Sequence, residues 1–255
     1  MPTFKMTVAY DGTGLVGWQR QAAGDSVQGL LESACAELNG DAVAVTGAGR
    51  TDAGVHALGQ VAAVALARDI DARAFVAAVN FRLPPAIRVL AAVEVPASFH
   101  ARFQARSKGY RYRIWNGSVL SPFERPYVWH VPAPVLDVTA MHAAARLLEG
   151  RHDFAAFQGA GSDTPTTERV VFSSRVVSEP PTVVTDATLI SYEVTGSGFL
   201  RYMVRTIAGT LVEVGRGSRS PEWLLEVLEG RERARAGPTA PAEGLFLTSV
   251  GYEEP

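Results

Sequence analysis

The chain has 255 residues, of which 47% are hydrophobic and 20% charged, and its formal net charge at pH 7 is −2. This composition is typical of a soluble protein of one or two domains, and no apolar run approaches the ~18 residues that a membrane-spanning helix needs. The single cysteine, Cys35, excludes an intrachain disulfide framework and a thiolate metal cluster, so we expect a cytoplasmic protein that does not enter a membrane.

The N-terminal part of the chain predicts secondary structure in the order β-α-β-β-α-β. Apolar residues at every second position from Phe4 to Tyr10 indicate a half-buried strand. Asp25 and Gln28 resemble a capping box ahead of a helix that buries Cys35 and stops at Asn39-Gly40. The other elements are expected as strands at about 42–47 and 60–66, a helix over 71–80 and a strand over 87–95.

The C-terminal part repeats this order of elements without a visible repeat of the sequence. Ser220-Pro221 is a favourable start for a helix that ends at Gly230. The other elements are expected as strands over 110–114, 169–177, 182–194 and 245–252, helices over 139–149 and 199–214, and a loop over 231–243.

Two β-α-β-β-α-β units predict an α+β fold built from two ferredoxin-like (RRM-like) halves. We place the N-terminal half at residues 1–103 and the C-terminal half at residues 104–255. If the two mostly antiparallel sheets meet edge to edge, the cleft between the halves is the natural ligand site.

Positive charge is concentrated in two stretches of this mildly acidic chain. Residues 99–123 contain no acid, and within 196–220 only Glu213 opposes four arginines. This distribution favours a focused site for an anionic ligand. The alternative is a solvated surface laced with ion pairs, which the absence of nearby acids in the sequence weakens. The cations are Arg102, Arg106, Lys108, Arg111 and Arg113 in the first stretch, and Arg201, Arg205, Arg216 and Arg219 in the second.

A glycine-rich stretch, Gly47 to Gly54, carries Arg50 and Asp52 between two apolar runs. Its glycines permit a tight loop beside a ligand. A phosphate-binding loop is disfavoured because no Gly-Lys-Ser/Thr follows. A structural hairpin and a loop that presents a carboxylate both remain open.

The segment from Phe99 to Ile114 interleaves aromatic residues with cations. Such a surface can stack a base while it neutralises phosphates. The alternative is a plain strand, which we prefer for Tyr112 and Ile114 as core residues. Similarly, Arg201 and Arg205 are four residues apart and would share one face of the predicted 199–214 helix, where a solvated face is the ordinary explanation.

These stretches resemble known motifs. Residues 49–57, Gly-Arg-Thr-Asp-Ala-Gly-Val-His-Ala, resemble the signature of the tRNA pseudouridine synthase A family, and residues 199–209 resemble its Phe-Leu-x-x-Met-Val-Arg-x-Ile-x-Gly motif. Further similar blocks span 10–21, 152–157 and 240–247. Leu15 and Val16 depart from the family pattern, which has an aromatic and a polar residue there.

The resemblance implies an enzyme that isomerises uridine to pseudouridine on the 3′ side of the tRNA anticodon stem-loop (tRNA positions 38–40). It implies no cofactor, a homodimer, and paired sheets that form one central platform with helices behind. Asp52 would be the catalytic aspartate, Arg205 its ion-pair partner and Tyr110 the residue that packs on uracil. RNA contacts are expected from Arg50, Tyr110, Arg102, Arg106, Lys108, Arg111, Arg201 and Leu245.

Two other classes of protein compete with this interpretation. A non-catalytic RNA-binding module with paired RRM-like sheets gives no reason for the Arg-Thr-Asp loop, and the usual aromatic sheet motif is missing. A phosphate-binding metabolic enzyme lacks its Walker lysine. The five histidines show no metal-ligand spacing, so we expect no metal. We expect His56 to be a structural hydrogen-bonding residue, and His152 and Asp153 to form a helix-to-loop cap.

Overall fold

The computed structural model describes residues 1–161, 164–179 and 186–253, which form two compact units. One unit contains Met1–Arg106 and the final segment from Phe246, and the other contains Ser107–Leu245. The described residues form ten strands, paired mostly antiparallel, and five α-helices. The predicted mixed α+β class is therefore confirmed.

The sheet of the first unit is centred on β1 (Thr3–Tyr10), which pairs antiparallel with β3 (His56–Ala65) and β4 (Ile87–Val95). Two shorter pairings lie on the other side of β3. β2 (Thr46–Gly47) pairs antiparallel with its distal part, and β10 (Leu245–Gly251) runs parallel beside its first residues. The predicted 42–47 strand is therefore mostly irregular, and the chain between β2 and β3 is an eight-residue loop, 48–55.

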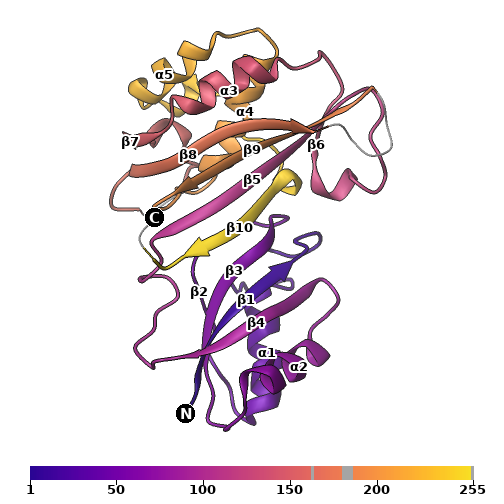
Figure 1. Ribbon diagram of the computed structural model, residues 1–255, viewed down its shortest axis with the longest axis vertical. Helices are drawn as coiled ribbons and strands as arrows, with labels where there is room; N and C mark the ends of the chain where they lie inside the picture. The colour runs from indigo at the N-terminus through magenta and orange to yellow at the C-terminus, as the bar shows by residue number, and fades with distance from the viewer. Residues whose placement is uncertain (162–163, 180–185, 254–255) are drawn as a thin grey trace. The chain divides into compact units, whose positions relative to one another are not determined.

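Both helices of the first unit cover one face of this sheet (Figure 1). α1 (Val27–Asn39) buries Cys35 as expected and ends at Gly40, whose φ of 87° is favourable only for glycine. Its N-cap is Ser26, not the predicted Asp25. The Ser26 hydroxyl accepts from Gly29 N, while the Gln28 side chain is engaged elsewhere. α2 (Ala72–Arg82) begins after Asp71, whose carboxylate accepts from Arg73 N and Ala74 N in the first turn of the helix.

The sheet of the second unit has the strand order β5-β9-β8-β7, all antiparallel. Tyr112 and Ile114 of β5 are completely buried, so the prediction that they are core residues is confirmed. Two short strands were missed, β6 and β7, because three or four residues carry too little periodicity. The strands of this unit are β5 (Ser107–Asn116), β6 (Trp129–Val131, parallel to β5), β7 (Gly150–Asp153), β8 (Glu168–Glu179) and β9 (Thr188–Gly196).

His152 and Asp153 lie on the short strand β7, and only His152 acts as a cap after the helix, because its Nε2 lies 2.9 Å from Glu149 O. The preceding helix already ends at Arg146, which leaves room for a strand before the next turn. Asp153 instead accepts from Ala155 N at the following 3-10 turn. The predicted start of the 182–194 strand, residues 182–185, lies outside the described residues.

Three α-helices cover one face of the second sheet (Figure 1): α3 (Val138–Arg146), α4 (Met203–Gly215) and α5 (Pro221–Gly230). α5 begins after Ser220, as predicted. α4 begins four residues later than predicted because Tyr202 has a left-handed φ of 62°, which cannot continue a helix. Arg201 is therefore outside the helix, and the predicted helix face shared by Arg201 and Arg205 does not exist.

Short 3-10 turns complete the described structure: η1 (Arg125–Tyr127), η2 (Ala155–Phe157), η3 (Arg233–Arg235) and η4 (Ala242–Gly244). The longest α-helices, α1 and α4, have 13 residues each. None of the helices described here is long and apolar enough to cross a bilayer.

Candidate active site

The loop that carries Asp52 is held by main-chain hydrogen bonds to the loop that follows β1. Trp18 N donates to Thr51 O at 3.0 Å, and Gly54 N donates to Leu15 O at 3.4 Å. Val55 N donates back to Asp52 O at 3.1 Å and closes a turn. Asp52, which is partly exposed, therefore lies on a backbone that is fixed before and after it.

Buried side chains anchor the residues on either side of Arg50. The Thr51 hydroxyl lies 2.7 Å from the Tyr10 hydroxyl in the core, and burial raises the pKa of Tyr10 to about 12, although hydrogen bonds with Thr51 and Gln60 oppose this shift. Gln60, fully buried on β3, donates to Gly49 O at 2.9 Å. These contacts tie the 48–55 loop to β1 and β3.

Two glycines of the 10–21 motif allow this close approach of loops. A Cβ on Gly12 would overlap the carbonyl oxygen of Val55. Gly17 has a φ of 100°, and a Cβ there would lie 2.6 Å from Thr51 O. The 10–21 block, expected only as a block similar to the family, therefore supports the Asp52 loop through its glycines.

His56 connects the same two loops from inside the core. It is 1% exposed, its Nδ1 accepts from Gly12 N at 3.0 Å, and the Asp11 carboxylate lies 3.1 Å from that nitrogen. Its ring stacks on Phe246 with 4.6 Å between ring centres. The prediction that His56 is a structural hydrogen-bonding residue is confirmed.

Arg50 is exposed but held by a chain of hydrogen bonds that begins on α1. Arg50 Nε donates to Gln19 Oε1 at 3.1 Å, Gln19 Nε2 donates to Gln28 Oε1 at 2.7 Å, and Gln28 Nε2 donates to Glu32 Oε1 at 3.3 Å. Because Arg50 Nε donates to Gln19, this hydrogen bond orients the guanidinium. This orientation depends on residues that the sequence analysis did not select.

Arg205 projects from the first turn of α4 and is held by the loop that precedes β10. Its Nε donates to Ala240 O at 2.7 Å, while Ala240 N donates to Arg205 O at 3.1 Å. The loop is itself fixed because the Tyr112 hydroxyl donates to Pro241 O at 2.8 Å. Burial and then the Glu243 carboxylate raise the pKa of Tyr112, whereas the Arg205 charge lowers it.

Tyr110 lies on β5 opposite Val194 and is partly exposed. The rings of Tyr110 and Phe199 pack edge to face, with 5.0 Å between ring centres and an angle of 77° between the ring planes. Tyr110 and Arg205 therefore belong to the second unit, whereas Asp52 and Arg50 belong to the first.

Comparison with known protein families gives a match over most of the chain. Residues 6–104 and 144–253 match the family described as tRNA pseudouridine synthase. The chain belongs to this family.

Curated relatives named tRNA pseudouridine synthase A align along the whole chain. The protein from Myxococcus xanthus is 47% identical over 254 residues, which cover 100% of this chain and 93% of the relative. The one from Syntrophotalea carbinolica is 47% identical over 252 residues, covering 99% and 97%. The one from Moorella thermoacetica is 45% identical over 254 residues, covering 99% and 100%. The predicted resemblance is confirmed.

The cations expected to contact RNA in this pseudouridine synthase family member differ in their surroundings. Arg102 and Arg106 are exposed in the first unit, and the Arg102 guanidinium lies 5.8 Å from the centre of the Phe103 ring. Lys108 lies partly exposed on β5. Arg201 is exposed and donates to the carbonyl oxygen of Ala160 at 3.1 Å. The apolar candidate Leu245, by contrast, is only 6% exposed.

Arg111 has a carboxylate partner that the sequence analysis did not foresee. Arg111 and Arg175 lie on either side of Glu193 in the sheet, with ion-pair distances of 2.8 and 2.6 Å. Burial raises the pKa of Glu193, but the hydrogen bonds from Arg175 and Arg111 outweigh it and lower the pKa. Arg113 likewise pairs with Glu124 at 2.9 Å. Arg111 and Arg113 therefore have acidic partners despite the absence of acids nearby in the sequence, and the expectation that their stretch is not laced with ion pairs was wrong for them.

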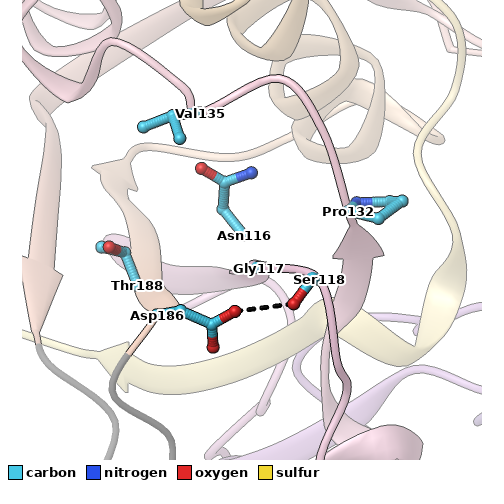
Figure 2. A pocket seen from close by; sticks show the side chains of 7 residues that line it. All are labelled: Asn116, Gly117, Ser118, Pro132, Val135, Asp186 and Thr188. Carbon is cyan, nitrogen blue, oxygen red and sulfur yellow. Dashed lines mark hydrogen bonds between the residues drawn. The ribbon is translucent and has the colours of Figure 1, made fainter.

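A separate hollow at the end of β5 is shown in Figure 2 and contains none of the candidate site residues. Asn116, at its base, is fully engaged. Its amide donates to Val131 O and Pro134 O, and its oxygen accepts from Leu136 N. Ser118 donates to Asp186 at 2.6 Å across the rim. These contacts indicate a structural role for the polar groups.

Proposed function

We propose that this chain isomerises uridine to pseudouridine on the 3′ side of the tRNA anticodon stem-loop (tRNA positions 38–40). The observation that carries the proposal is identity of 47% along the whole chain with tRNA pseudouridine synthase A of Myxococcus xanthus. The intact Gly-Arg-Thr-Asp-Ala-Gly loop and its buried supports agree with it.

One carboxylate suits this reaction because nothing is hydrolysed overall. Glycoside hydrolysis typically uses two carboxyl groups, one to protonate the leaving group and one to activate water or attack. Here the bond from ribose C1′ to uracil N1 breaks, the retained uracil rotates, and a bond from C1′ to C5 forms. The C5 proton is then lost and N1 regains a proton. Asp52 is the group proposed to attack C1′ or to stabilise its positive charge, and then to assist proton removal.

Arg205 is proposed to pair with Asp52 and keep it ionised, because an opposite charge within ~4–6 Å favours the charged form. Tyr110 would stack on the target uracil, and Arg50 would fill the space that the extruded nucleotide leaves. Flipping a nucleotide costs a few kcal/mol, of which stacking on Tyr110 returns ~1–3 kcal/mol.

The larger arrangement is also a proposal that rests on the family resemblance. The two ferredoxin-like halves would form one platform of sheets, with helices behind it and the active site in the cleft between the halves. The chain would act in the cytoplasm as a homodimer, each tRNA touching both subunits and meeting the cations Arg102, Arg106, Lys108, Arg111 and Arg201, with Leu245 at the substrate.

The test of function is tritium release from tRNA labelled at uridine C5. We expect release in the presence of excess EDTA, and none from free uridine or its nucleotides. A non-catalytic RNA-binding module would bind the tRNA without releasing tritium. A phosphate-binding metabolic enzyme would instead hydrolyse free nucleotides in a metal-dependent way. Either result would reject the proposal.

The salt dependence of tRNA binding tests the proposed phosphate contacts. The slope of log affinity against log salt is negative, and each lost phosphate contact reduces its magnitude by ~0.7–0.9. We expect this change for Arg106→Ala and Lys108→Ala, and a smaller one for Arg111→Ala because Glu193 already opposes that charge. Arg146→Ala is the matched control, since Arg146, the last residue of α3, pairs with Glu149. An unchanged slope in Arg106→Ala and Lys108→Ala would show that these cations do not face RNA.

A further inference from the structure

Tyr202, the residue before α4, has a backbone conformation that is unfavourable for its side chain. Its φ of 62° is left-handed, and within the described ranges only Arg231, with a φ of 56°, shares this feature among non-glycine residues. An aromatic residue persists in this region only where its surroundings impose it, and such strain is concentrated at functional sites.

The surroundings of Tyr202 are two guanidinium groups and a glycine. The Cζ atoms of Arg201 and Arg205 lie 4.7 and 4.9 Å from the centre of the Tyr202 ring, within the range of a cation–π interaction. Arg201 also donates to the Tyr202 hydroxyl at 3.1 Å. Gly159 packs against the ring so closely that a Cβ there would overlap it.

The left-handed turn allows one residue both to begin α4 and to place its ring against a side chain of that helix. Tyr202 O accepts from Thr206 N at 2.9 Å, so the helix starts directly after the turn. The ring then contacts the guanidinium of Arg205, whose Nε is held by Ala240 O at 2.7 Å. The Ala240 carbonyl at the edge of the Arg205 guanidinium and the Tyr202 ring 4.9 Å from its Cζ together restrict the position and the tilt of this group.

We propose that Tyr202 is a positioning residue that holds the Arg205 guanidinium in the orientation needed for the reaction. The inference rests on the proposed function, in which Arg205 serves Asp52. Arg201 strengthens the arrangement because it fixes the ring through the Tyr202 hydroxyl and is itself tied to Ala160 O.

The test compares Tyr202→Asn with Tyr202→Phe. Asparagine tolerates the left-handed conformation but removes the ring, so thermal stability should change little. We expect kcat to fall by about tenfold, as the loss of a partly desolvated cation–π contact implies, while KM for tRNA changes less than about twofold. Phenylalanine retains the ring and should restore most of the lost kcat. Arg231→Asn, which relieves the same conformation after α5, is the matched control and should leave kcat unchanged.

The variant Arg205→Lys shows whether Tyr202 acts through Arg205. If it does, adding Tyr202→Asn to Arg205→Lys should lower kcat by much less than tenfold. Equal effects in both backgrounds, a normal kcat in Tyr202→Asn, or a Phe variant as slow as the Asn variant would overturn the inference. A normal kcat in Arg205→Ala would instead overturn the proposed role of Arg205.

Discussion

Replacing Asp52 by Asn is expected to reduce pseudouridine formation by at least about a thousandfold, as the loss of an enzyme's nucleophile commonly does. The carboxamide has nearly the same shape as the carboxylate but has no charge and is a poor nucleophile. The loop should keep its structure, because its contacts from Trp18 N and Val55 N go to main-chain oxygens. The loss should therefore appear in kcat, with tRNA affinity largely retained.

Single-turnover tritium release measures the chemical step of this variant, and a tRNA binding assay measures its affinity. Asp41→Asn is the matched control because Asp41 is an exposed acid of the same unit, outside the loop. Turnover by Asp52→Asn above about one per cent of the wild-type rate would rule out Asp52 as the nucleophile.

Arg205→Ala is expected to have the second largest effect, a near-complete loss of rate with most of the tRNA affinity retained. In the proposed pairing with Asp52, loss of the guanidinium makes protonation of that carboxylate easier, so the proposal expects the acid limb of the pH–rate profile to move to higher pH. Arg205→Lys should recover part of the rate, since it keeps the charge but loses the Nε bond to Ala240 and the stacking on Tyr202.

Kinetics and binding should be measured on the same preparations of this variant. Arg216→Ala provides the control, because Arg216 caps the other end of α4 and pairs with Glu213 at 2.9 Å. A variant Arg205→Ala that loses only tRNA affinity, with a normal kcat, would make Arg205 a phosphate contact.

Several elements could be predicted from local sequence because their signals are local. β4 spans 87–95 as predicted, because this segment is rich in Ile and Val and follows the break at Pro84-Pro85. α5 begins at Pro221 because Ser220 and Pro221 favour a helix start wherever they occur. The predicted start of α4 was wrong because Tyr202 is left-handed. This conformation depends on contacts with Gly159, Arg201 and Arg205, which local sequence does not reveal.

The sequence by itself determined the family, the mixed α+β class and the loop that carries Arg50 and Asp52, because each is written in consecutive residues. Only the tertiary structure decided which residues support that loop and the cations of the candidate site. Tyr10 meets Thr51 across 41 residues, Arg205 meets Ala240 across 35, and Arg111 meets Glu193 across 82. Such contacts depend on how strands pair and how loops pack, and neither periodicity nor spacing along the chain encodes which distant partner a buried hydroxyl or a guanidinium will find.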